Sequence, residues 1–283
     1  MTLVDEALVA ALPGTAPRRR RSRPRRLIGL LAPLLLLGSW QLVSAGGVIS
    51  TRLLPSPWTV ARSLGQFFFG DGAVALAGVV PFTGAGFEHL QASLGRCAFS
   101  WLLAVAVGTV IGLLLGLSPL ARDLLDPVLN ALRAVPLFAW LPLALIWFGI
   151  GEGAARALIF IGALWPVLVS VGDSTARVPR SYVETARMLG TPRHALWRKV
   201  YLPSALPEVV TGLRLSLTLA WTCVIVGELT GTDRGVGAMM NAARETGRTE
   251  QVIVGILVFA AVGLTFDLTL RRVARRWVRW AQA

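Results

Sequence analysis

The segments YVETARMLG, residues 182–190, and VYLP, residues 200–203, form a polar interruption between two apolar runs, and this interruption decides how the chain is organised. Good helix formers predict a short helix from Val183 to Leu189, and Gly190 is the residue type that ends a helix in the left-handed conformation. The pair Thr191–Pro192 predicts a new helix start with the threonine as N-cap, and the proline at position 203 is expected to break this second helix. The sequence therefore predicts two short helices joined by a glycine hinge and presented to water.

Composition places the chain in a membrane. Apolar residues make up 54% of it and the mean hydropathy is +0.64, while the charged residues lie between the apolar runs. Six runs are close to the roughly 20 residues that a helix needs to cross the hydrocarbon. They cover residues 27–45, 97–117, 127–149, 153–173, 207–229 and 252–270. We expect an all-α membrane protein with six transmembrane helices.

The apolar runs divide the chain into five expected parts. An external loop before the second run should contain a short amphipathic helix, with Ser56 as N-cap and Pro57 at its first position. The parts are an Arg-rich tail at 1–26, the first transmembrane helix at 27–45, the external loop at 46–96, a five-helix core at 97–270 that includes the loop 174–203, and a basic tail at 271–283.

The distribution of cations predicts the orientation. With the N-terminus inside, nineteen of the 28 Lys and Arg residues fall on the cytoplasmic side and seven on the other, while Arg133 and Arg214 lie within spans. The positive-inside rule then places both termini and the Glu184 loop in the cytoplasm. The net charge of +13 does not indicate a nucleic-acid binder, because the arginines flank membrane spans. The run from Arg18 to Arg26 also resembles a signal-peptide n-region, so cleavage after the first run stays an alternative to a membrane anchor.

The sequence contains no catalytic constellation. A Walker A motif needs Gly-Lys-Ser/Thr, whereas the single lysine, Lys199, stands between Arg198 and Val200. Cys97 and Cys223 lie in or beside apolar runs without metal-ligand spacing, so we expect them to be packing residues and expect no metal. Transport energy must come from a partner or, in the alternative, from an ion gradient. A secondary transporter would normally show deep acidic residues and an internal repeat, and neither is evident.

Two further patterns concern packing and the translocation path. Gly108, Gly112 and Gly116 recur at four-residue intervals and predict close approach of two helix backbones, unless they are common membrane-helix filler. Ser and Thr recur across residues 216–222 of the fifth run, and such polar groups should face the protein interior or a water-filled cavity. The candidate path residues are Trp165 and Trp221 near mid-span, Thr222, Glu228 toward an external gate, and Arg214, which would attract an anion unless it snorkels to the membrane surface.

The spacing of the Glu184 loop resembles the EAA loop of ABC importer permeases, in which Glu-Ala-Ala is followed by three residues, Gly, nine residues, Ile, one residue and Leu-Pro. Thr185 in place of Ala and Val200 in place of Ile are the departures. The matching positions are Glu184, Thr185, Ala186, Gly190, Val200, Leu202 and Pro203. Weaker matches at 54–57, 147–150, 226–228, 235–237 and 240–242 make the chain similar to the permeases of aliphatic sulfonate, taurine and nitrate importers.

The resemblance implies the architecture of a type I ABC importer permease in a bacterial inner membrane. In that family the loop is the surface on which a separate cytoplasmic ATPase docks, and the ATPase holds ATP and magnesium. It further implies two permease copies, an external substrate-binding protein, and alternating access for a small solute, often an organic anion. Because this chain supplies one six-span half, we expect a homodimer, and no cofactor within the chain itself.

Overall fold

The computed structural model describes residues 24–47, 49–70 and 84–277, and the chain divides into two units, Met1–Thr51 and Arg52–Ala283. In the described part of the first unit, the helix α2 (Pro24–Ala45) covers the first apolar run. Of the Arg-rich tail expected at 1–26, residues 1–23 lie outside the described residues, and residues 24–26 belong to α2.

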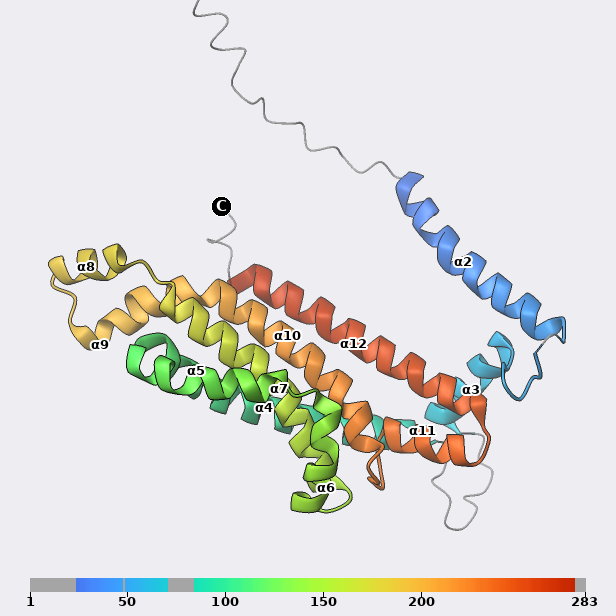
Figure 1. Ribbon diagram of the computed structural model, residues 1–283. Helices are drawn as coiled ribbons and strands as arrows, with labels where there is room; N and C mark the ends of the chain where they lie inside the picture. The colour runs from blue at the N-terminus through green and yellow to red at the C-terminus, as the bar shows by residue number, and fades with distance from the viewer. Residues whose placement is uncertain (1–23, 48, 71–83, 278–283) are drawn as a thin grey trace, which may run out of the picture. The chain divides into compact units, whose positions relative to one another are not determined.

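The second unit is helical throughout its regular structure, as far as the structure describes it (Figure 1). Its elements are α3 (Pro57–Phe69), α4 (Gly86–Leu117), α5 (Pro119–Ala134), the 3₁₀ turn η1 (Leu137–Trp140), α6 (Leu141–Phe148), α7 (Glu152–Ala176), α8 (Arg180–Met188), α9 (Arg193–Leu196), the π-helical η2 (Trp197–Tyr201), α10 (Leu202–Glu228), α11 (Val236–Glu245) and α12 (Thr249–Trp277). α8 lies at one end of this bundle and α11 toward the other.

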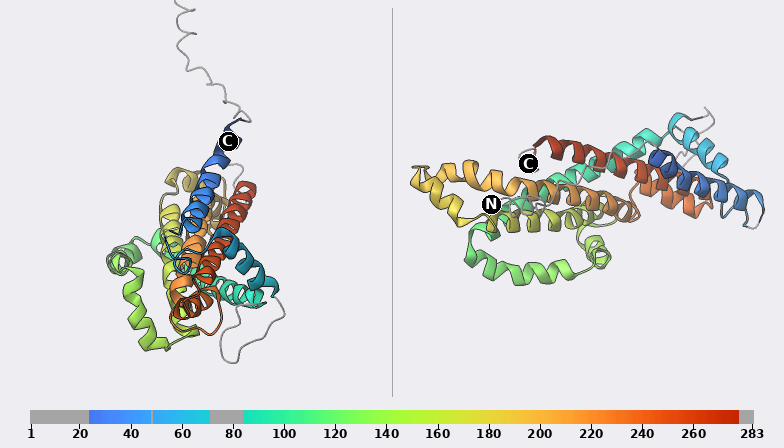
Figure 2. Two further views of the ribbon diagram at one scale, coloured as in Figure 1. Left: turned by 90° about the vertical axis from the view of Figure 1, so that its right-hand side faces the viewer. Right: turned by 90° about the horizontal axis from the view of Figure 1, so that it is seen from above.

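Four helices in the described chain are long and apolar enough to cross a membrane: α4, α7, the continuous helix His194–Glu228, and α12. The third apolar run was expected as one span at 127–149, but it is a bent pair in which α5 meets η1 and α6 at 94°. The bend falls at Val135, which is extended because the following Pro136 disfavours the helical conformation there. The pair stands to one side of the other helices (Figure 2).

α7 is the central helix, and its contact with α4 depends on small residues. A Cβ added at Gly112 would lie 2.8 Å from the carbonyl oxygen of Leu168, and one at Gly116 would lie 2.9 Å from that of Gly172. Gly108 faces the same helix one turn earlier, at Val167. The glycine stripe therefore lies in the contact between α4 and α7, where larger side chains would force the backbones apart.

A different face of α7 packs on α10. Ser216 Oγ donates a hydrogen bond of 2.6 Å to the Ala163 carbonyl, and a Cβ at Gly227 would lie 3.0 Å from the Ala155 Cα. Ser216 is fully buried in this contact, whereas Thr222 is exposed and donates to the Thr218 carbonyl on its own helix. The polar residues of the fifth run therefore point in more than one direction.

The external loop expected at 46–96 is shorter and more ordered than the sequence indicated. α3 begins as predicted, since Ser56 Oγ accepts the Thr59 N–H, and its buried side chains Val60 and Phe67 belong to a helix that packs on α4 and α12. α4 begins at Gly86, inside the expected loop, and α11 follows a glycine turn in a stretch for which no helix was predicted. Residues 71–83 of the glycine-rich loop lie outside the described residues.

Candidate functional site

The Glu184 loop folds as two short helices that project from one end of the bundle, and we call residues 180–196 the α8–α9 protrusion (Figure 1). Gly190 has φ +77° and donates its N–H to the Arg187 carbonyl at 2.9 Å. Thr191 N–H donates to the Ala186 carbonyl at 3.0 Å, which completes a Schellman-type helix end. The hinge thus has the left-handed geometry that glycine adopts without strain.

One small apolar cluster holds the protrusion together. Val183 of α8 is buried with Leu196 of α9 and Val200 of η2. Apolar side chains at the C-terminal end of α8 are exposed instead: Met188 is 86% exposed and Leu189 82% exposed. Exposed apolar side chains gathered on one surface indicate a binding surface for another protein.

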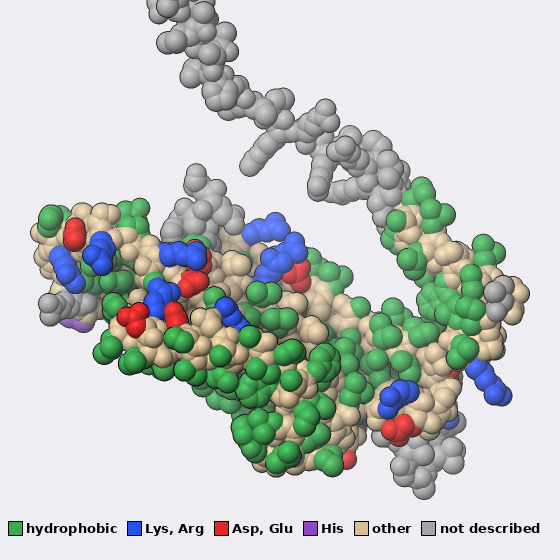
Figure 3. Space-filling model, in the orientation of Figure 1, with side chains coloured by type: hydrophobic (Ala, Val, Ile, Leu, Met, Phe, Trp, Pro, Cys, Tyr) green, Lys and Arg blue, Asp and Glu red, His purple; other side chains and the backbone are tan. Residues whose placement is uncertain are grey.

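The other loop positions divide between this core and the surface. Glu184, Thr185 and Leu202 are exposed, whereas Ala186 and Pro203 are half-buried. Charged side chains also gather toward this end of the bundle, as Figure 3 shows on one face. The matched loop residues therefore form one continuous structure, and their role as a docking surface stays a prediction.

Two local predictions for this loop are wrong. Pro192, not Thr191, occupies the N-cap position of α9, and no side chain caps that helix. The second helix is not broken at Pro203, because Leu202 N–H donates to the Trp197 carbonyl five residues back. This wide π turn relieves the clash between the proline ring and the preceding turn, so Pro203 lies in the first turn of a continuing helix.

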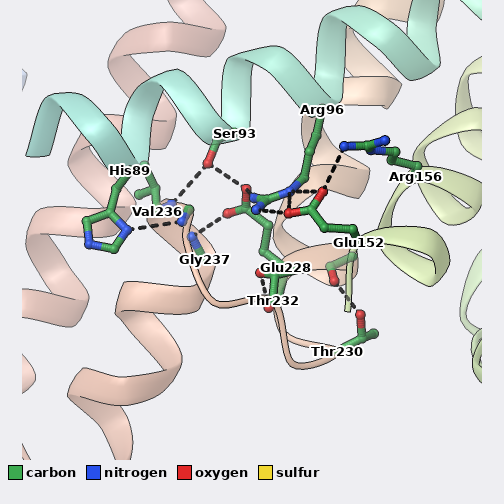
Figure 4. A network of polar contacts seen from close by, with 12 residues as sticks. His89, Ser93, Arg96, Glu152, Arg156, Glu228, Thr230, Thr232, Val236 and Gly237 are labelled. Carbon is green, nitrogen blue, oxygen red and sulfur yellow. Dashed lines mark hydrogen bonds and ion pairs between the residues drawn. The ribbon is translucent and has the colours of Figure 1, made fainter. Parts of the chain in front are cut away.

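At the opposite end, Arg96 joins two acidic residues from different helices (Figure 4). Its Nη1 donates to Glu228 Oε1 at 2.6 Å, and its Nε donates to the two carboxylate oxygens of Glu152 at 2.8 and 2.9 Å. Arg96 is 4% exposed and Glu228 is 1% exposed. A cation that bridges two carboxylates compensates charges that would otherwise be costly to bury.

The same network fixes the turn that leads into α11. Glu228 accepts hydrogen bonds from Ser93 Oγ at 2.6 Å and from the Gly237 N–H at 2.7 Å. Ser93 Oγ in turn accepts the Val236 N–H at 2.9 Å (Figure 4). Glu228, predicted as a gate residue, therefore lies in a closed polar cluster that ties α4, α7, α10 and α11 together.

Two more predicted path residues, Trp221 and Arg214, also make specific contacts. Trp221 is buried, and its Nε1 donates to the Phe259 carbonyl of α12 at 2.9 Å. Arg214 Nε donates to Asp267 Oδ1 at 2.7 Å, and Asp267 also pairs with Arg271. These side chains join α10 to α12, so Arg214 carries a compensated charge.

Trp165, in contrast, faces open space. Three cavities of about 180, 260 and 210 Å³ follow one another along α7, and together we call them the α7 groove. Trp165 and Arg133 line both the first and the second cavity, while Trp140 and Ile161 line both the second and the third. Of the five predicted path residues, Trp165 alone lines any of these three cavities, namely the first and the second.

Sequence reasoning missed the importance of three residues. Arg96 and Glu152 belong to the buried network, and their partners lie far away in the sequence. Arg133 was placed within an apolar run and given no role in the path, but it lines the groove. The only available signal was the presence of a charged residue inside or beside an apolar run.

Comparisons with known proteins agree with this architecture. A family model described as "Binding-protein-dependent transport system inner membrane component" matches residues 108–279. Among solved structures, the fold is similar to that of the inward-facing MetNI methionine ABC transporter, with a TM-score of 0.57 and 22% identity over 67% of this chain and 94% of that chain.

Three curated relatives cover most of the chain. It is 36% identical to the putative aliphatic sulfonates transport permease protein SsuC of Bacillus subtilis over 95% of both chains. It is 37% identical to the taurine transport system permease protein TauC of Escherichia coli, over 89% of this chain and 88% of the relative. It is 31% identical to the nitrate import permease protein NrtB of Leptolyngbya laminosa, over 93% of this chain and 96% of the relative. The chain therefore belongs to the family of binding-protein-dependent transport system inner membrane components, and it is a permease of an ABC importer.

Proposed function

We propose that two copies of this chain form the membrane pathway for a small anion, and that a separate ATPase drives the pathway by binding the α8–α9 protrusion. The observation that carries the proposal is the protrusion itself. It has its own apolar core and a left-handed hinge at Gly190, and it exposes Met188 and Leu189 at the end of the bundle. Family membership makes this a more economical account than an ion-gradient-driven transporter.

The ATPase is the partner that this surface suits. Exposed apolar side chains on α8 give a docking helix its contact area, and the exposed Glu184 and Arg187 on the same helix add charges that can fix its orientation. ATP and magnesium would then be held by the partner, since Lys199 stands outside any Walker A motif. Hydrolysis there would move the helices between inward-facing and outward-facing arrangements.

This assignment places the α8 end in the cytoplasm and the α11 end on the outside. The C-terminal end of α12, whose last turns contain Arg271, Arg272 and Arg275, lies toward the same end as the protrusion (Figure 1). An excess of Lys and Arg on one side is typical of the cytoplasmic face. An external substrate-binding protein would deliver its ligand to the α11 end.

A second copy is supported by the bent pair of α5, η1 and α6. Its described helices bury only Ala144, and they leave apolar side chains such as Leu124, Phe138 and Ile146 exposed. In the proposed dimer, a second copy of the chain would cover part of this surface and close the α7 groove into a pathway. The remaining apolar surface would face lipid, which tolerates it.

An anionic solute is the choice that the relatives favour. Their names specify aliphatic sulfonates, taurine and nitrate, and a negatively charged group bound through oxygen atoms is common to these solutes. The three solutes differ in size and in the group attached to the anion. We therefore propose an oxyanion as the substrate class, not one solute.

The hinge provides a direct test. A Cβ at Gly190 would meet nothing within 4 Å, so substitutions act through the left-handed backbone alone. Gly190→Val should abolish copurification of the ATPase and uptake of taurine, ethanesulfonate and nitrate, because a β-branched residue strains this conformation. The matched control is Gly190→Asn, which tolerates the left-handed region and should retain both. Uptake and copurification at wild-type levels in Gly190→Val would overturn the docking proposal.

A further inference from the structure

We propose that Arg133 holds the oxyanion of the substrate at the middle of the α7 groove, with Trp165 as the facing wall. This inference rests on the proposed function, because it assumes that the groove belongs to the pathway. It assigns the anion site to α5 and α7, away from Arg214, where the sequence predicted it. The argument has three parts: the position of Arg133, its charge, and the nature of the walls around it.

The position of Arg133 is the junction of two cavities. It lies in the last turn of α5, just before the 94° bend, and lines both the first cavity and the second. Trp165 of α7 is the other residue shared by both. A solute that moves from the first cavity to the second would therefore pass beside these two side chains.

The charge of Arg133 is not compensated by any carboxylate in the part of the chain that the structure describes. In the first cavity both acidic residues are already paired, because Arg122 contacts Asp126 at 3.4 Å and Asp173 at 3.1 Å. In the second cavity, Arg133 is the sole charged residue among those that line it. A guanidinium within a membrane segment is costly unless it meets water or an anion.

The lack of a carboxylate partner distinguishes Arg133 from Arg96 and Arg214. Arg96 bridges two carboxylates, and Arg214 is bound to Asp267. An incoming anion would have to displace those carboxylates, whereas at Arg133 it meets free donors. The planar guanidinium also suits a sulfonate or nitrate, because two of its N–H groups can donate to two oxygen atoms of one anion.

The walls beyond Arg133 suit the rest of a small organic anion. The second cavity, of about 260 Å³, is lined by Leu219, Ile161 and Trp140 in addition to the shared pair. A short alkyl chain attached to an oxyanion can lie there while its charged end stays at Arg133. The groove should therefore favour an aliphatic oxyanion over a cation of the same size.

Thiol labelling tests the anion site without knowledge of the natural solute. In a variant of the assembled permease–ATPase complex that lacks Cys97 and Cys223, a cysteine replaces Leu129, which lies one turn before Arg133 and lines the first cavity. The cysteine is labelled with three methanethiosulfonate reagents: the anionic sulfonatoethyl, the cationic trimethylammonium-ethyl and the neutral methyl compound. The labelling rate of each charged reagent is divided by the rate of the neutral one. The first reagent is itself an aliphatic sulfonate.

The anionic-to-cationic ratio should fall on the order of tenfold in Arg133→Gln, because one nearby positive charge is lost. Arg133→Lys should keep most of the ratio, and excess ethanesulfonate should slow labelling only while position 133 is cationic. Arg214→Gln is the matched control, since its charge is paired outside the groove, and it should leave the ratio unchanged. An unchanged ratio in Arg133→Gln, with normal labelling by the neutral reagent, would overturn the proposal.

A second measurement separates this inference from the proposed function. Arg133→Gln should slow ethanesulfonate uptake about tenfold, the size expected for one charge-assisted hydrogen bond, while the ATPase still copurifies. Gly190→Val should lose uptake and ATPase binding but, when both are labelled as the permease without ATPase, it should keep the labelling ratio of the wild type. If Gly190→Val transports normally while the ratio still depends on Arg133, the docking proposal fails and the anion site stands.

Discussion

The two ends of the second unit differ in the side chains that they bury and expose. At the α11 end, the charged side chains of Arg96 and Glu228 are buried and pair with each other, and Arg96 also binds the exposed Glu152. At the α8 end, the apolar side chains of Met188 and Leu189 are exposed and have no such cover. The first end is complete within one chain, whereas the second, according to the function proposed above, is completed by the ATPase. Substitutions at the first end should therefore alter stability, and those at the second should alter assembly.

The largest loss of stability is expected for Arg96→Met. Glu228 would remain buried without its cation, and breaking a buried ion pair in this way costs about 3 kcal/mol or more. The thermal unfolding of the purified protein, followed by the loss of monodisperse material on heating, should shift to a lower temperature.

The double variant Arg96→Met with Glu228→Gln provides the control for this prediction. It removes the charge that the single variant leaves unpaired, so it should recover part of the lost stability. Equal unfolding temperatures in Arg96→Met and the wild type would show that the α11 end does not depend on this network.

An intermediate effect is expected where α4 and α7 connect the two ends. Gly112→Val would place its side chain against the Leu168 carbonyl, and overpacking of this kind costs about 2 kcal/mol. Gly95→Ala is the matched control on the same helix, because its Cβ would meet nothing within 4 Å. The same thermal assay should separate the two. If they unfold alike, the close contact between α4 and α7 does not contribute to stability.

The smallest change in stability is expected at the α8 end, although it should affect transport most directly. Met188→Glu alters an exposed side chain, so the free energy of unfolding should change by no more than about 0.5 kcal/mol. The ATPase should nevertheless copurify poorly, because a charge replaces apolar contact area, while Met188→Leu should bind normally. A marked fall in the unfolding temperature of Met188→Glu would contradict the proposal that the α8 end serves assembly and not stability.

Local patterns in the sequence predicted the α8 end well and the α11 end poorly. The helix from Val183 and the hinge at Gly190 depend on neighbouring residues, so spacing alone was sufficient. Arg96 and its two carboxylates lie 56 and 132 positions apart, and no periodicity connects them. The buried network therefore could not be predicted before the helices were packed.

The remaining differences have the same physical origin. The ion pair between Asp267 and Arg271 spans one helical turn, a spacing visible in the sequence, whereas the bond from Arg214 to Asp267 joins different helices. Pro203 was expected to end a helix, but a π turn at 197–201 accommodates it, and propensity does not anticipate that turn. In the groove, Trp165 was identified because it is aromatic and near mid-span, while Arg133 became a candidate only once its lack of a carboxylate could be seen.

The π turn has a mechanical consequence. Since it does not interrupt the helix, His194–Glu228 is one continuous helix with a length of about 50 Å along its axis at 1.5 Å per residue, running from the protrusion to the buried network. When a rigid helix of that length tilts about its middle, each end moves by roughly 0.4 Å for every degree of tilt. If the helix stayed rigid, a displacement of α9 would therefore displace the end of α10 near Arg96 by a comparable distance, and no side chains in between would have to rearrange. The π turn at 197–201 is the place where the helix could bend instead of moving as a whole. The stiffness of this turn would therefore determine how much of the movement at α9 is transmitted to the other end of α10.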